Sequence, residues 1–236
     1  MSLIEKASWQ HQIIDGAPIK LESKQITPPA NTELRFFAIE HGDDSNTDYI
    51  AEVLKDTDIY FPEINSWDPL TAKFLQKVSN GDAKARQKML ESSSSGYMAF
   101  TNAMIRGLYN TRANVRMADL PNTSSIPDKL SRMAYINGGL SQSAFSLMAE
   151  RDKHIANTIC NEISLAQQEV PRFRDKTIKA TAIFGVGHFS VASALQDAVK
   201  AQNSESFSIN LLFTEEAASA TGADVIDYAN WLRTED

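Results

Sequence analysis

Residues 178–195 contain the pattern that most constrains the fold. An apolar run at 178–184 is followed at once by the sequence GVGH, which ends at His188, and then by a segment compatible with a helix. This order predicts a buried strand, a tight turn and a helix. In open α/β sheets, ligands bind at the edge where the carboxyl ends of the strands meet. We therefore expect an α/β fold that delivers His188 to that edge.

The remainder of the chain alternates between strand-like and helix-like patterns. Long helical stretches are predicted at 69–110 and 126–169, and a short helix after residue 46. Such alternation favours right-handed parallel crossovers. The predicted fold is α/β, a mainly parallel sheet of about five strands with helices on both faces. The other strands are expected at 35–41, 57–63, 114–118 and 207–213.

Two regions are expected along the chain. Residues 1–34 contain glycine and proline residues that interrupt regular secondary structure. We interpret this region as an N-terminal extension packed on the domain. Residues 35–236 are expected to form a single α/β domain, because this length suits one large core. A short helix at 225–232 is expected to close the chain.

Composition narrows the possible partners and setting. The chain has 236 residues, a net charge of -7 and 42% hydrophobic residues, which is typical of a globular protein and unfavourable for binding nucleic acid or anionic membranes. No apolar run approaches the roughly 20 residues needed to span a membrane. The N-terminus has no secretory pattern, and the single cysteine, Cys160, has no internal disulfide partner. A cytoplasmic protein is expected, although injection as a bacterial effector would leave little trace in the composition.

Polar side chains follow four of the predicted strands. They are Glu40 and His41, Glu63, Asp119, and His188. Because the carboxyl ends of parallel strands share one edge, these side chains are expected to converge. A divalent metal such as Mn, Co or Zn would suit Glu40, Glu63 and His188 as ligands. The same groups are also suited to general acid–base chemistry without a metal.

Arg151 is predicted to lie on the buried face of a helix. It comes three residues after Met148 and four before Ile155 in an apolar stripe. A guanidinium is effectively always charged, and an unpaired buried charge is costly. Arg151 should therefore meet one of the strand-end carboxylates or an anionic ligand. Three positions remain open for Asp152: paired with Arg151, paired with Lys153, or near the site.

Other readings of the same residues are weaker. In a dinucleotide fingerprint, Ser190 would stand at the third glycine, and no acidic strand end follows at the required distance of roughly twenty residues. Ser143 and Ser146 lack a nucleophile-elbow pattern. His154 is expected to be a surface or cap residue, and Cys160 a small packing residue.

The order of these motifs resembles a known superfamily. A strand ends in Glu40-His41, a second ends in Glu63, a long helix carries Arg151, and an apolar strand ends in a G-x-x-H motif at His188. This arrangement, over residues 34–213, is similar to the superfamily of erythromycin esterases, TraB/Tiki proteins and ChaN-like haem-binding lipoproteins. In that family the paired glutamates, the helix arginine and the last histidine line one pocket. Ile39 stands where the family usually has a glycine.

The resemblance implies a pocket but leaves its reaction open. The leading expectation is a hydrolase for an ester or amide bond in a small molecule or peptide. Glu40, Glu63 and His188 would hold a metal, or His41 or His188 would activate water without one. Arg151 would then stabilise an oxyanion or bind a substrate carboxylate. The alternative is a non-catalytic small-molecule or haem-binding protein, or a bacterial effector of this fold.

Overall fold

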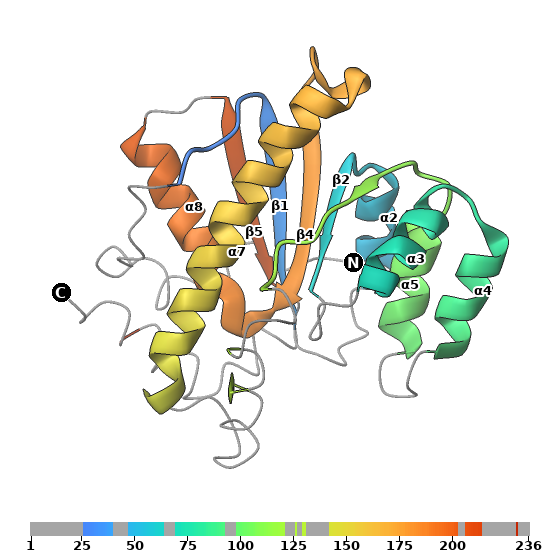
Figure 1. The fold of residues 1–236 in the computed structure, drawn as a ribbon, viewed down its shortest axis with the longest axis horizontal. Coiled ribbons are helices and arrows are strands. Elements are labelled where there is room, and N and C mark those ends of the chain that lie inside the picture. Colours follow the sequence, from blue (N-terminus) through green and yellow to red (C-terminus); the bar gives the residue numbers. More distant parts are fainter. Residues whose placement is uncertain are drawn as a thin grey trace.

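The described strands form one sheet in which every pairing is parallel (Figure 1). Its order is β3-β2-β4-β1-β5. The bounds are β1 (Thr32–Ile39), β2 (Ile59–Pro62), β3 (Asn114–Val115), β4 (Ile178–Gly185) and β5 (Phe207–Phe213). The predicted α/β class with a five-stranded parallel sheet is confirmed. The computed structural model describes residues 26–39, 47–63, 69–92, 98–120, 126, 129–130, 142–202, 206–213 and 230.

Helices cover both faces of the sheet, as predicted. On one face lie α2 (Thr47–Lys55), α3 (Pro69–Ser79), α4 (Ala83–Ser92) and α5 (Met98–Leu108), and on the other lie α7 (Gln142–Glu169) and α8 (Phe189–Ala201) (Figure 1). Successive residues of β1 point to opposite faces, so Phe36 packs in the core under α7 and α8 while Phe37 packs in the core under α2 and α5. Phe36 also stacks on Phe184 of β4, with ring centroids 5.5 Å apart.

The strand order places a switch point beside β4. The connections from β1 to β2 and from β2 to β3 run toward one end of the sheet, whereas those from β3 to β4 and from β4 to β5 run toward the other. Right-handed crossovers in opposite directions put their helices on opposite faces. The segments that follow β2 and β1 therefore leave the sheet on one face, and the segment that follows β4 leaves it on the other. A binding crevice is expected where the carboxyl ends of such neighbouring strands meet.

The element boundaries differ from the predicted ones in several places. β1 begins at Thr32, inside the predicted extension, and Ile26 is buried in the core with 1% of its surface exposed. β2 and β3 are shorter than expected, and the predicted helical stretch 69–110 divides into α3, α4 and α5. The predicted helix at 225–232 lies outside the described residues except for residue 230.

The turn after β4 is a short 3-10 helix, η4 (Val186–His188), that runs directly into α8. This geometry replaces the simple tight turn expected from the sequence. A second 3-10 helix, η3 (Pro171–Phe173), precedes β4. No helix in the described part of the chain is long and apolar enough to cross a membrane.

Candidate functional site

Four of the predicted side chains converge at the carboxyl edge of the sheet. Glu63 follows β2, Asp119 follows β3, His188 ends η4, and Arg151 reaches them from α7. The remaining two predicted site residues, Glu40 and His41, lie outside the described residues. We therefore build the site from the four residues that the structure places.

His188 lies between two carboxylates. Its Nδ1 atom is 2.5 Å from Oδ1 of Asp152, and its Nε2 atom is 3.4 Å from Oε1 of Glu63. The imidazole also meets the ring of Phe184 edge-on, with centroids 5.7 Å apart. Each ring nitrogen therefore faces an acid while the ring packs on an aromatic side chain, which holds the imidazole in one orientation.

Arg151 makes a two-point contact with Asp119. Its Nε donates to Oδ1 at 2.8 Å and its Nη2 donates to Oδ2 at 2.5 Å. The same Nη2 is 3.6 Å from Oε1 of Glu63. Arg151 was predicted to meet a strand-end carboxylate or an anionic ligand; the structure shows a strand-end carboxylate, and the two-point geometry makes Asp119 the principal partner.

Glu63 connects the two halves of the site. Its backbone N–H donates to the carbonyl of Ile183 at 2.9 Å, which extends the β2–β4 pairing to the strand end. Its Oε2 accepts a hydrogen bond from the backbone N–H of Gly185, and its Oε1 faces both Arg151 and His188. The carboxylate is thus anchored by the start of the G-x-x-H turn.

Asp152 is the member of the site whose position the sequence argument left open, and the structure places it at the site. Its side chain has no exposed surface, and Ser190 of α8 donates a hydrogen bond to its Oδ2 atom while His188 occupies Oδ1. A signal was present, because Asp152 comes four residues after Met148 and four before Ala156. Both neighbours are buried, so the position lies within the apolar stripe.

Burial and charge act in opposite directions on His188. Burial and the repulsion from Arg151 lower the pKa of the imidazole. The charge of Asp152 and the hydrogen bonds to Asp152 and Glu63 raise it. The raising effects are larger, and the pKa of His188 is about 9. For Arg151, burial again lowers the pKa, and the hydrogen bond and charge of Asp119 more than compensate. Both groups are therefore cations at neutral pH.

The result is a buried chain of alternating charges. It runs Asp119, Arg151, Glu63, His188, Asp152, and the exposed fraction of each side chain is between 0% and 9%. Low dielectric surroundings strengthen every attraction in such a network. They also make the loss of any single member costly, because its partner is left buried and unpaired.

The donor set offers part of a metal site. Two ligands at about 2.1 Å from one tetrahedral ion lie roughly 3.4 Å apart, which matches the separation of Glu63 Oε1 and His188 Nε2. Among the described residues, however, no group of three His, Cys, Asp or Glu side chains is arranged to hold a metal. The third predicted ligand, Glu40, lies outside the described residues. The cationic Arg151, 3.6 Å from Glu63, opposes a second positive charge at this place.

Two other candidates behave as structural residues. Cys160 is buried in the core on α7, and burial raises the pKa of its thiol to about 12, which disfavours the reactive thiolate. His154 is half-buried, its Nε2 is 3.3 Å from Thr158 Oγ1, and burial lowers the pKa of its imidazole. The packing role predicted for Cys160 is confirmed.

Comparison of the chain with known protein families, characterised proteins and solved structures finds no match.

Proposed function

We propose that the protein is a hydrolase of ester or amide bonds whose acid–base pair is His188 and Glu63. The observation that carries the proposal is the double restraint on the imidazole, with Nδ1 held by Asp152 and Nε2 facing Glu63 at 3.4 Å. Orienting one nitrogen with a buried acid directs the other toward Glu63 for proton transfer, as a general acid–base pair requires. The position at the carboxyl edge beside the switch point supports the same conclusion.

In the proposed reaction, Glu63 accepts a proton from a water molecule as the water oxygen attacks the carbonyl carbon. The His188 imidazolium then donates its Nε2 proton to the leaving oxygen or nitrogen as the bond to carbon breaks. The proton on Glu63 returns to His188 across the short gap between them. Asp152 is a positioning residue that favours the imidazolium, and Arg151 would stabilise the developing oxyanion from beside Glu63.

The metal-dependent version of the proposal uses the same edge. Glu63, His188 and Glu40 would hold a Mn, Co or Zn ion, which would polarise the carbonyl and lower the pKa of bound water. His188 must lose its proton to bind a metal, whereas its raised pKa favours the imidazolium. The cationic Arg151, 3.6 Å from Glu63, also opposes a second positive charge at this place, so the metal-free version is the leading proposal.

The wider assignment follows from the sequence. We propose membership of the erythromycin esterase, TraB/Tiki and ChaN-like superfamily, a small-molecule or peptide substrate, and a cytoplasmic site of action or delivery as an effector. The alternative is a non-catalytic binding protein, and one observation favours it: each charged side chain of the site is at most 9% exposed. A substrate would need an opening that admits it to Glu63 and His188.

A screen of the purified full-length chain tests the proposal. Hydrolysis of p-nitrophenyl esters and of fluorogenic peptides would be measured with and without a chelator, after metal analysis of the same sample. His188→Asn should lower turnover at least about 100-fold, as expected when an acid–base catalyst is lost. His154→Asn is the matched control. His154 is a histidine of α7 that lies outside the proposed acid–base pair, so this variant should retain activity. Absence of turnover in the native chain, or full activity in His188→Asn, would reject the proposed chemistry.

A further inference from the structure

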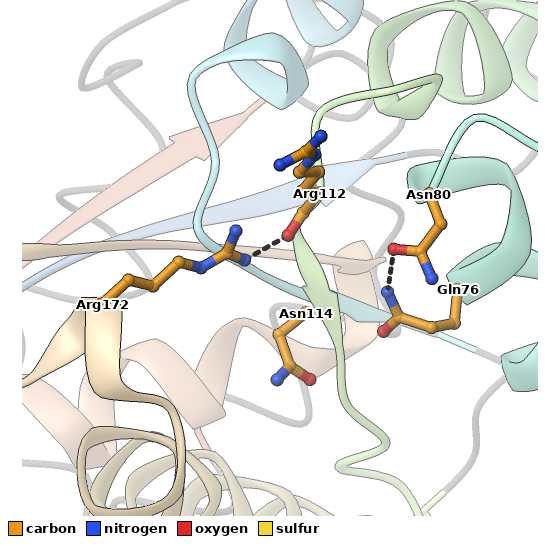
Figure 2. A pocket seen from close by; sticks show the side chains of 5 residues that line it. All are labelled: Gln76, Asn80, Arg112, Asn114 and Arg172. Atoms are coloured by element: carbon orange, nitrogen blue, oxygen red, sulfur yellow. Dashed lines mark hydrogen bonds between the residues drawn. The ribbon is translucent and has the colours of Figure 1, made fainter.

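A polar pocket lies at the opposite, amino edge of the sheet. It has a volume of about 360 Å³ and is lined by Gln76 of α3, Asn80 just after that helix, Arg112, Asn114 at the start of β3, and Arg172 of η3 (Figure 2). This volume is within the range of small-molecule sites. The pocket is separate from Glu63 and His188, which follow the carboxyl ends of the strands, and the proposed hydrolysis does not use it.

The pocket is positively charged in a protein of net charge -7. Two guanidinium groups line it and no carboxylate does. Arg116, which donates a hydrogen bond to Asn114, is already neutralised by Glu162 at 2.9 Å and Glu169 at 3.0 Å. Arg112 and Arg172 have no ion pair within the described residues, so their charge remains available to a ligand.

Two of the three lining amides, those of Asn80 and Asn114, offer donors to a ligand. The backbone N–H of Val115 donates to Oε1 of Gln76 at 2.8 Å, which turns the Gln76 amide nitrogen toward Oδ1 of Asn80 at 3.2 Å. Arg116 Nε donates to Oδ1 of Asn114 at 2.9 Å. The amide oxygens of Asn80 and Asn114 each accept a hydrogen bond, and within the described residues their NH₂ groups donate none, so these groups are available to a ligand. The NH₂ group of Gln76 is fully used, because it also donates to the carbonyl of Ala113 at 3.1 Å.

Contacts within the protein hold the side chain of Arg172 and the backbone of Arg112. Arg172 donates from Nη2 to the carbonyl of Arg112, as Figure 2 shows, and its guanidinium lies 4.9 Å from the ring centroid of Phe173. Arg112 has a left-handed backbone with φ of 63°, fixed by a hydrogen bond from its N–H to the carbonyl of Ser79 at 2.9 Å. Non-glycine residues seldom adopt this conformation, and such positions cluster at functional sites.

We infer that this pocket binds the phosphate group of a small phosphomonoester. Guanidinium and amide N–H groups supply only donors, which complements a ligand whose oxygens only accept. Phosphate is favoured over nucleic acid because the pocket is small and the protein is acidic overall. A ligand bound here would lie at the amino ends of β3 and β4, whereas the proposed hydrolytic centre lies at the carboxyl edge of the same sheet.

Calorimetry on the full-length chain tests the inference with inorganic phosphate and glycerol 3-phosphate as probes. We expect saturable binding that weakens at least about tenfold in Arg112→Gln and in Arg172→Gln, the loss of one charged contact. Arg174→Gln is the matched control, because Arg174 lies two residues from Arg172 and outside the pocket. Circular dichroism melting of each variant establishes that it is folded.

Each outcome bears on the inference. Weaker binding in both pocket variants but not in Arg174→Gln supports the site, and tighter binding of glycerol 3-phosphate than of inorganic phosphate supports a phosphomonoester. Sedimentation with phosphatidate vesicles distinguishes a lipid headgroup, which would be indicated by vesicle binding that the same variants abolish. No saturable binding, or equal weakening in Arg174→Gln, overturns the inference. Phosphate binding that survives in His188→Asn separates this result from failure of the proposed hydrolase.

Discussion

The Nδ1 atom of His188 lies 2.5 Å from Oδ1 of Asp152, and neither side chain is more than 5% exposed. The two residues come from different elements, the turn after β4 and the middle of α7. Their contact joins the sheet edge to the long helix that crosses it. It also sets the protonation of His188, because the buried carboxylate favours the imidazolium.

Stability should depend on pH through His188. Its pKa is about 9 in the folded protein against 6.5 ordinarily, so protonation favours the native state. This contribution is fully present below about pH 6.5 and is lost as the pH rises to about 9. The free energy of unfolding of the native chain, minus that of His188→Asn, should fall by roughly 3 kcal/mol across this window in urea titrations. Parallel curves for the two proteins would show that His188 has an ordinary pKa.

Asp152→Asn should lower the pKa of His188 toward its ordinary value. The substitution removes the buried charge that contributes most to raising this pKa, yet keeps an oxygen for Ser190. The chain has only four histidines, so the ring-proton titration by NMR can be assigned by substitution. Glu162→Gln, which changes a carboxylate elsewhere on α7, should leave the titration unchanged. A His188 pKa that stays near 9 in Asp152→Asn would contradict the assigned role.

Arg151→Met should destabilise the fold strongly. Methionine preserves much of the volume but leaves Asp119 buried and unpaired, which costs about 3–5 kcal/mol in comparable buried pairs. The control is Arg116→Met, whose partly exposed pairs with Glu162 and Glu169 should contribute about 1 kcal/mol or less each. Urea unfolding of both variants measures the difference. Equal losses of unfolding free energy would mean that the buried contact of Arg151 with Asp119 stabilises the fold no more than the exposed pairs of Arg116.

Gly107→Ala should loosen the packing of α5 on α2. A Cβ atom at this position would lie 2.5 Å from the carbonyl oxygen of Ala51, so the helices must separate, at a cost of about 1–3 kcal/mol. The matched control is Gly187→Ala, where the added Cβ would meet only Met148 Cε at an ordinary 3.6 Å. Thermal melting should show a clear fall for Gly107→Ala and little change for Gly187→Ala. The reverse order would reject the packing argument.

Local patterns in the sequence predicted that the strands exist, where they lie approximately in the chain, and at which edge of the sheet the site lies. The continuous apolar run of β4 and the run of β5 predicted their positions closely, because strands buried on both faces must be apolar throughout. The alternation of strands and helices predicted parallel pairing, and parallel pairing alone places Glu63, Asp119 and His188 at one edge. The buried position of Arg151 followed from helical periodicity in the same way.

Tertiary structure decided which of these groups meet. The strand order puts β4 between β2 and β1, so His188 faces Glu63, and this order is not encoded in any local pattern. The choice of Asp119 as the partner of Arg151, and of His188 and Ser190 as the partners of Asp152, depends on how α7 is seated across the sheet. Such contacts join residues far apart in the chain. They are set by the packing of whole elements. The attraction between two charged side chains becomes strong only when the surrounding core has excluded water.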